Sequence, residues 1–226
     1  MKIKYFLQLI ILFLGIFWIT PSFASISSEE STIWANNKGE EILNILTSKN
    51  TSKKISALDK IMSEDIDLDH AAQFVVGKYW RQMSDEQKKR YIPLFKRYAH
   101  SLYKNYPLNI NKGDITFEVN KVIIDKGIAN IFCTIYISTL EQNVTESSKG
   151  GIKVSFIVTK KNNHLLLRDL KIEESSLLLS FRERFYKMIH EDSDDEIDWF
   201  LEDFEALVED NEYQNDQNLY IQKFSC

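Results

Sequence analysis

The sequence predicts an α+β fold in which a curved antiparallel sheet of about four strands is covered on its apolar face by N-terminal and C-terminal helices. Two observations support this prediction. Apolar residues recur every three or four positions before residue 107, alternate with polar residues between 115 and 172, and return to the helical period from 177. The chain also has only 7 Gly and 3 Pro among 226 residues, so most of it should form regular structure.

Residues 1–24 are predicted to be a secretory signal peptide that lies outside the fold. Lys2 precedes an apolar run, and Ala24 ends the short segment where a signal peptidase would cut. The alternative is an uncleaved membrane anchor, but the run is short for a span that needs about 20 residues. We therefore expect one domain at residues 25–209, followed by a polar, disordered tail at residues 210–226.

The chain is acidic and carries two cysteines. The formal net charge is −5. Nucleic acid is excluded as the expected partner, because phosphate binding requires a basic surface. Cys133 lies in a strand-like run and Cys226 is the last residue, so a disulfide would attach the tail to the core. The favoured interpretation is that Cys133 is a small buried apolar residue and that Cys226 is free.

Three helices are expected before the sheet. The first covers residues 33–46 and ends in a polar stretch, and the second begins near Asp67. The third begins at Ser84, which can form a capping box with Gln87. Apolar residues follow at spacings of three and four, and Pro93 within this stretch should kink or split the helix.

Four segments alternate apolar and polar residues, as strands with one buried face do. The turn signals Asp-Lys-Gly at 125–127 and Lys-Asn-Asn at 161–163 separate neighbouring segments and favour hairpins. The apolar face of this meander must be covered by helices. The predicted strands are residues 115–119, 129–137, 152–158 and 165–172.

Helical periodicity returns after the strands. One helix is expected at residues 177–189, and a last helix is expected to open at Ser193 with Glu196 in a second capping box. The region from Glu191 to Glu212 is strongly acidic. The favoured interpretation is the solvated face of an amphipathic helix, and docking to a basic partner is the alternative.

Residues 65–76 resemble a calcium-binding loop at their start but lack two of the residues that such a loop requires. Asp65, Asp67 and Asp69 resemble the start of a calcium-binding loop. However, His70 replaces the glycine that the loop requires, and Val76 replaces its final glutamate. We therefore interpret the three aspartates as the acidic start of a helix.

The sequence contains no recognisable catalytic set. The four histidines are far apart, and no phosphate-binding glycine loop or metal-spaced cysteine pair occurs. We expect no metal and no cofactor. One enzyme hypothesis remains, in which Asp169 acts as a base in an apolar pocket that raises its pKa. The favoured alternative is a strand-end carboxylate paired with Arg168 or a lysine.

Two stretches carry a family resemblance. The first is FVVGKYWRQMSDEQ at 74–87, and the second is RDLKIE followed by Ser-Leu and Phe-Arg between 168 and 182. Over residues 33–207 the chain resembles the MlaC family, the toluene-tolerance auxiliary components, which are periplasmic phospholipid carriers. The sequence departs from the family pattern at Glu174 and Ser175, where Gly and Val are usual, and this leaves the turn geometry open.

The resemblance implies a lipid pocket between the sheet and the helices. Two acyl chains with about 30 methylenes, at about 0.8 kcal/mol each, correspond to on the order of 20 kcal/mol of apolar burial. Arg81 and Arg97 are candidates for contact with the lipid phosphate, because guanidinium matches phosphate oxygens. The expected lining comprises Phe74, Val75, Tyr79, Phe95, Tyr98, Leu102, Val119, Ile131, Ile135, Val154, Phe156, Leu170, Phe181 and Phe185.

The resemblance also implies partners and a location. The cargo would be a phospholipid, and no covalent step is expected. The partners would be an outer-membrane lipoprotein–porin complex and an inner-membrane ABC transporter with a substrate-binding ring, which together maintain outer-membrane lipid asymmetry. The expected location is the periplasm. Two other hypotheses stay open: a small enzyme that uses Asp169, and a periplasmic interaction module.

Overall fold

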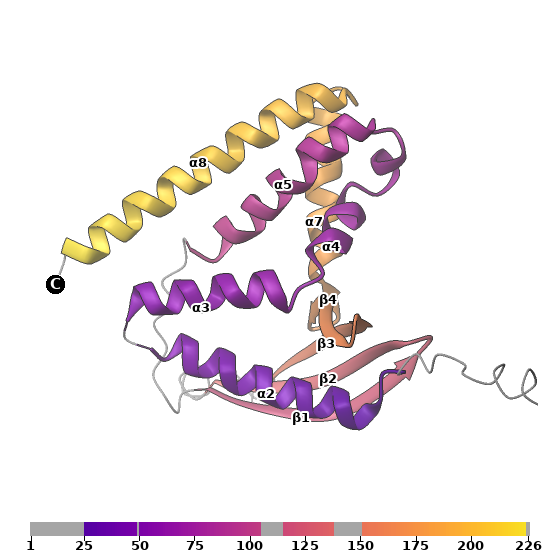
Figure 1. Cartoon of the computed structure of the whole chain (residues 1–226), viewed down its shortest axis with the longest axis vertical. Coiled ribbons are helices and arrows are strands. Elements are labelled where there is room, and N and C mark those ends of the chain that lie inside the picture. Colours follow the sequence, from indigo (N-terminus) through magenta and orange to yellow (C-terminus); the bar gives the residue numbers. More distant parts are fainter. Residues whose placement is uncertain (1–24, 49, 105–114, 138–150, 225–226) are drawn as a thin grey trace, which may run out of the picture.

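The structure, a computed structural model, describes residues 25–48, 50–104, 115–137 and 151–224 (Figure 1). The predicted signal peptide lies outside these residues. None of the described helices combines the length and apolarity needed to cross a membrane. The predicted α+β class is confirmed: within the described residues, six α-helices accompany one antiparallel sheet.

The sheet contains five strands in the order β1-β2-β3-β4-β5, so each strand pairs with its neighbour in the chain. Two of the turns adopt left-handed backbone conformations that suit tight hairpins, with positive φ at Lys126 and Gly127 and at Asn162 and Asn163. These are the turns that the sequence predicts. The strand bounds are β1 Ile115–Asp125, β2 Ile128–Ile137, β3 Ile152–Lys161, β4 His164–Ile172 and β5 Ser175–Ser176.

The fifth strand follows a turn at the position where the sequence departs from the family pattern. Glu173 and Glu174 have φ values of 47° and 69°, and Lys171 pairs with Ser176 across the turn. A non-glycine residue in this region costs about 1–2 kcal/mol. Glu174 therefore holds a conformation that glycine would adopt without strain.

The Glu174→Gly variant is expected to raise the free energy of unfolding by up to about 1 kcal/mol, because relief of strain exceeds the added entropy of the unfolded chain. Urea denaturation measures the difference. The matched control is Ser175→Gly, at an exposed strand residue. This variant should instead lower the free energy of unfolding by about 0.5–1 kcal/mol. Equal losses in the two variants would contradict the strain at this turn.

The N-terminal part contains one helix more than predicted. Helix α2 (Ser28–Leu46) is the expected first helix, and α3 (Thr51–Glu64) follows it directly. The polar stretch that was interpreted as a helix end contains the start of α3. Asn50 caps this helix, since its side-chain oxygen accepts a hydrogen bond from the Lys53 amide at 2.9 Å.

Helix α4 (Leu68–Val76) begins where predicted, with Asp67 as its N-cap. The short helix η1 (Gly77–Arg81) leads to α5 (Asp85–Leu102), whose predicted capping box between Ser84 and Gln87 is confirmed. Pro93 does not split α5, contrary to one expected outcome. Pro93 and Lys89, whose carbonyl loses its partner, are both exposed, so water can solvate the carbonyl.

The C-terminal part is more helical than predicted. Helix α7 (Leu177–Lys187) continues into the π-helical turn η3 (Met188–Asp192). The last helix, α8 (Ile197–Phe224), does not open at Ser193, because positive φ at Asp194 and Asp195 separates the two helices. Helix α8 continues past residue 209 to Phe224, where the sequence predicts a polar, disordered tail, and it contacts α5, for example where the Asn215 amide donates to the Ser101 carbonyl at 3.2 Å.

The apolar side chains form two separate clusters. The sheet cluster joins α2 to β1, β2 and β3, with Ile131 and Val158 fully buried. The helical cluster joins α4, α5, α7 and α8. Figure 1 shows the sheet and α2 at one end of the molecule, α5 and α8 at the other, and α3 between them. Among the C-terminal helices, α7 contacts β4, and α8 packs mainly on α5.

Candidate functional site

The structure divides the predicted lining between the two clusters. The fully buried members of the helical cluster are packed core residues. The helical cluster contains Phe74, Val75, Tyr79, Phe95, Tyr98, Leu102, Phe181 and Phe185, and the sheet cluster contains Val119, Ile131 and Phe156. The other three members, Ile135, Val154 and Leu170, also lie on the sheet.

Phe185 is at the centre of an aromatic core. Its ring centroid lies 5.2 Å from that of Phe204 and 5.9 Å from those of Phe95 and Tyr98. All four side chains are at most 5% exposed. Edge-to-face and tilted pairs of this kind fill space densely. These predicted lining residues therefore have a packing role in the structure.

Two buried tyrosines satisfy their hydroxyl groups within the helical cluster. The Tyr91 hydroxyl donates to the Ala72 carbonyl at 2.9 Å, and the Tyr79 hydroxyl donates to Asp195 at 2.5 Å. Burial, followed by the hydrogen bond to Asp195, raises the pKa of Tyr79 to about 12. The first hydrogen bond joins α5 to α4, and the second joins η1 to the turn that precedes α8.

The half-buried members of the predicted set differ from this core. Phe156 pairs with Ile131 on β2 and with Leu170 on β4, so these three residues lie on one face of the sheet. Phe156 and Leu170 are only half-buried, although they lie on the same face as Ile131. The full set of half-buried members is Phe74, Leu102, Val119, Ile135, Phe156, Leu170 and Phe181.

Helix α3 has an apolar side that no described residue fully covers. Ile55, Leu58 and Ile61 recur at helical spacing, and each is half-buried. The fully buried residue of this helix is Lys54. Because α3 contacts α2 on one side and α5 on the other, this partly covered apolar side lies between the two clusters. The described residues therefore shield these three apolar side chains only in part.

Two hollows in the described part of the chain are lined largely by charged or polar residues, unlike the apolar clusters. One, of about 410 Å³, lies where α3 ends and α4 begins, and charged side chains including Asp67, Lys96 and Lys161 line it. The other, of about 560 Å³, lies on the face of the sheet away from α2 and is lined by Phe132 and several polar residues. Val154 is the one member of the predicted set that lines either hollow.

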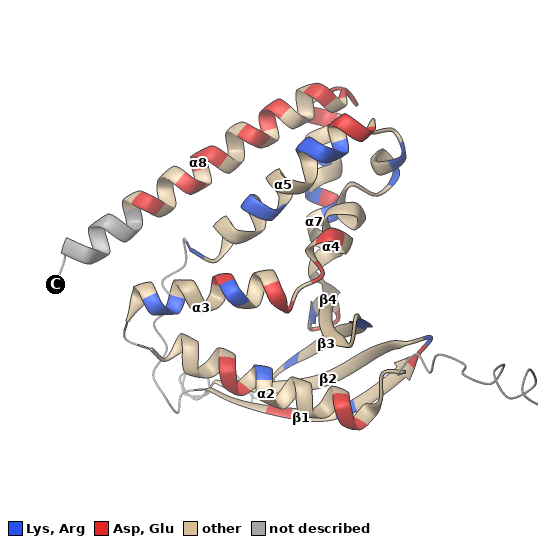
Figure 2. Ribbon diagram, in the orientation of Figure 1, with Lys and Arg blue, Asp and Glu red and all other residues tan. Residues whose placement is uncertain are grey.

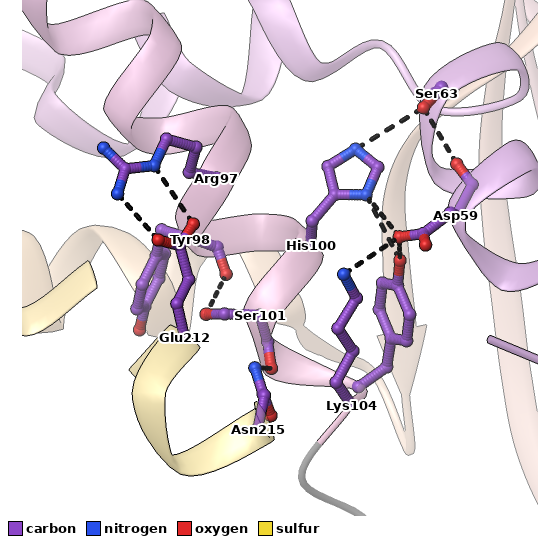
Figure 3. A network of polar contacts seen from close by, with 10 residues as sticks. Asp59, Ser63, Arg97, Tyr98, His100, Ser101, Lys104, Glu212 and Asn215 are labelled. Atoms are coloured by element: carbon purple, nitrogen blue, oxygen red, sulfur yellow. Dashed lines mark hydrogen bonds and ion pairs between the residues drawn. The ribbon is translucent and has the colours of Figure 1, made fainter. Parts of the chain in front are cut away.

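The two arginines considered for phosphate contact have different surroundings. The Arg97 guanidinium makes two hydrogen bonds to Glu212 of α8, at 2.7 and 3.0 Å (Figure 3). These hydrogen bonds raise the pKa of Arg97. Arg97 therefore has a structural partner, whereas Arg81 is exposed on η1. Phosphate contact by either residue stays a prediction.

A polar network around Asp59 joins α3 to α5 (Figure 3). Its carboxylate accepts hydrogen bonds from His100 at 2.9 Å and from Tyr103, and it lies 3.5 Å from the Lys104 ammonium. Burial raises the pKa of Asp59, but these donors outweigh burial and hold it below its usual value. The network connects α3 to the helical cluster.

Ser63 adds a serine–histidine–aspartate arrangement that the sequence did not suggest, because the residues lie on two helices. Ser63 Oγ lies 3.4 Å from His100 Nε2, but its hydroxyl donates to the Asp59 backbone carbonyl at 2.8 Å. The Asp59 carboxylate is shared with two other donors besides His100. The serine is therefore not oriented as an activated nucleophile.

Asp169, the candidate base, is used to begin a helix. One of its oxygens accepts from the Ser176 hydroxyl at 2.6 Å, and the other accepts from the Leu178 amide at 3.1 Å. The expected pairing with Arg168 is absent from the described ion pairs, because Arg168 contacts His70 at 2.6 Å. Burial and the Arg168 charge lower the pKa of His70. This geometry gives Asp169 a capping role.

The two stretches that carry the family resemblance contact each other. The Arg182 side chain donates to the Phe74 carbonyl at 2.8 Å and stacks on the Phe74 ring at 3.9 Å. The Tyr186 hydroxyl accepts a hydrogen bond from the Lys78 amide at 3.0 Å, beside Gly77. The most specific parts of the sequence thus build the α4–α7 junction.

These features define an α+β protein with an antiparallel sheet, a separate helical core and a set of half-buried apolar side chains on α3 and the sheet. The chain belongs to the MlaC family: the family model described as MlaC protein matches residues 36–206. Comparison with curated proteins gives no significant match.

A solved structure has the same fold. It is the phospholipid-binding protein from Ralstonia solanacearum in complex with a phospholipid. The two chains are 15% identical, with a TM-score of 0.59, and the match covers 78% of this chain and 97% of the other. At this identity the comparison supports the fold.

Proposed function

We propose that the protein is a periplasmic phospholipid carrier that works without a covalent step. The observation that carries the proposal is the set of half-buried apolar side chains on α3 and on the sheet face, which the described residues cover only in part. Family membership and the fold shared with a phospholipid-binding protein support it. The predicted signal peptide supports export to the periplasm.

The acyl chains would lie between the sheet face and the helical cluster. Burial of about 30 methylenes represents on the order of 20 kcal/mol, which the hydrogen bonds of a head group cannot replace. Phe156 and Leu170 would form the sheet wall, and Phe74, Leu102 and Phe181 would form the helical wall.

In this proposal, lipid passes between two membrane complexes. The partners would be an outer-membrane lipoprotein–porin complex and an inner-membrane ABC transporter with a substrate-binding ring. Family membership supports these partners. Loading and release would be transfers between binding sites, so the carrier would need no catalytic residue.

Native mass spectrometry of protein purified from a bacterial periplasm tests the proposal. The wild type is expected to carry a non-covalent adduct with the mass of a diacyl phospholipid. The Phe156→Asp variant should lose this adduct, since a carboxylate in contact with acyl chains is strongly unfavourable. The matched control is Phe132→Asp on the adjacent strand, whose ring lies on the opposite face and is 38% exposed.

The variants must be compared at equal stability. Thermal unfolding followed by circular dichroism identifies the fraction folded for each variant. Folded Phe156→Asp protein that keeps full lipid occupancy would contradict the proposed site, and wild-type protein without any adduct would contradict the proposed function.

A further inference from the structure

Helix α8 presents two faces with different chemistry. Its inner face buries Phe200, Leu201 and Phe204 in the helical cluster. Its outer face exposes Trp199 and Tyr213, which are 57% and 65% exposed and are the most exposed large apolar side chains in the described part of the chain. Exposed aromatic residues of this size are typical of protein interfaces.

The two aromatic residues lie on one line of the helix. Trp199, Ala206 and Tyr213 are seven residues apart, which corresponds to about two turns and about 10 Å for each step. Ala206 is exposed and small, so the surface between the two rings is low. The two rings are therefore about 20 Å apart along the helix, so a partner element that lies along α8 is needed to contact both.

Carboxylates flank this aromatic line in the sequence, and Figure 2 shows acidic residues recurring along α8. Glu202, Asp203, Glu209 and Asp210 are all exposed and form no ion pair with any described residue. The sequence has no Lys or Arg between residues 187 and 223. The outer face of α8 is thus a concentrated negative field around two aromatic anchors.

The inner carboxylates of α8 provide a contrast. Arg90 binds Glu205 at 2.6 Å, and Arg97 binds Glu212 at 2.7 Å, so the arginines of α5 neutralise the inner side. Like charges four residues apart, as at Glu205 and Glu209, destabilise an isolated helix by a few tenths of a kcal/mol. Among the outer carboxylates, Asp210 accepts a hydrogen bond from the Gln214 amide at 2.9 Å, but no described Lys or Arg forms an ion pair with any of the four.

We propose that the outer face of α8 is a docking surface for a basic protein surface, in which Lys or Arg side chains surround an apolar contact. Charge complementarity selects this partner, because an anionic membrane would be repelled by the same carboxylates. The proposal rests on the proposed carrier function, which requires a protein to receive the lipid. Trp199 and Tyr213 would be the anchors, and the four carboxylates would speed and orient the encounter.

The test uses a defined probe, a synthetic helical peptide with Lys residues on both sides of a Leu stripe. Titration followed by tryptophan fluorescence and calorimetry should detect salt-dependent binding to the full mature chain. A peptide with Glu in place of Lys should not bind. The Trp199→Ala variant and the combined variant E202Q/D203N/E209Q/D210N should each weaken binding at least about 10-fold, equivalent to about 1.4 kcal/mol.

A matched control removes the same amount of charge elsewhere. The combined variant E29Q/E40Q/E86Q/E183Q neutralises four exposed carboxylates on other helices and should bind the peptide as the wild type does. Both α8 variants should carry the same phospholipid adduct as the wild type, which separates a failure of docking from a failure of the carrier function.

Several results would overturn the docking proposal. These are unchanged peptide affinity in both α8 variants, equal loss in the control variant, or equal binding of the Glu peptide. Stronger binding to phosphatidylglycerol vesicles than to the peptide would identify a membrane contact in its place. Self-association of the wild type that is lost in Trp199→Ala would identify a second copy as the occupant.

Discussion

Replacement of Phe185 by alanine is expected to lower the free energy of unfolding by about 3–5 kcal/mol. The side chain is fully buried and contacts rings from α5 and α8, so its removal leaves a cavity that the surrounding helices cannot close. Urea denaturation monitored by circular dichroism measures the loss. The control is Phe132→Ala on the exposed sheet face, which should lose at most about 1 kcal/mol.

This variant separates two roles for Phe185. The sequence predicts that it lines the lipid pocket, whereas the structure places it in a filled aromatic core. A lining residue contacts the cargo, and its truncation would change lipid occupancy with little loss of stability. A loss below about 1 kcal/mol, combined with altered lipid occupancy, would therefore contradict the packing role.

Replacement of Gly77 by alanine is expected to lower the free energy of unfolding by about 3 kcal/mol, which corresponds to a fall of roughly 6–12 °C in Tm. Gly77 has φ of 50° and ψ of −111°, a conformation that side chains other than glycine rarely adopt. A Cβ atom would also overlap the Tyr186 hydroxyl, which accepts a hydrogen bond from the Lys78 amide. The Tyr186 ring packs edge-to-face on Tyr79, with 5.4 Å between the ring centroids. Tyr186 cannot move without loss of these contacts.

The matched control for this variant is Gly127→Ala. Gly127 also has a positive φ, of 77°, but an added Cβ would meet no atom within 4 Å. The Gly127→Ala variant should lose only about 1 kcal/mol of unfolding free energy, which is the cost of the backbone strain. Differential scanning calorimetry of both variants compares the two costs. Equal shifts in Tm would show that the contact with Tyr186 does not contribute.

The sequence predicted the elements best where local signals are strong. The capping box at Ser84 and the turns at 125–127 and 161–163 depend on residues close in the chain, and the structure confirms them. Helix α3 was missed because its capping residue, Asn50, lies within a polar stretch that looks like a loop. The start of α8 was misplaced because Ser193 is followed by two residues with positive φ, which sequence periodicity does not reveal.

The candidate site was harder to predict than the fold. Phe185 and Phe156 both lie on apolar faces of regular elements, and their sequence environments are alike. Only the structure shows that rings from α5 and α8 enclose Phe185 and that Phe156 is left half-buried. Likewise, only the structure shows that α8 continues past residue 209 and brings Glu212 to Arg97, the residue predicted to contact the lipid phosphate.

The sequence by itself determined the order of the helices and strands other than α3 and β5, the antiparallel meander and the family to which the chain belongs. These depend on local periodicity, turn residues and short motifs, which act over a few positions. The tertiary structure decided which apolar side chains are closed into a core and which are left accessible, and it gave Asp169 and Arg97 their partners. Periodicity identifies the apolar face of an element, but the element that covers this face comes from elsewhere in the chain.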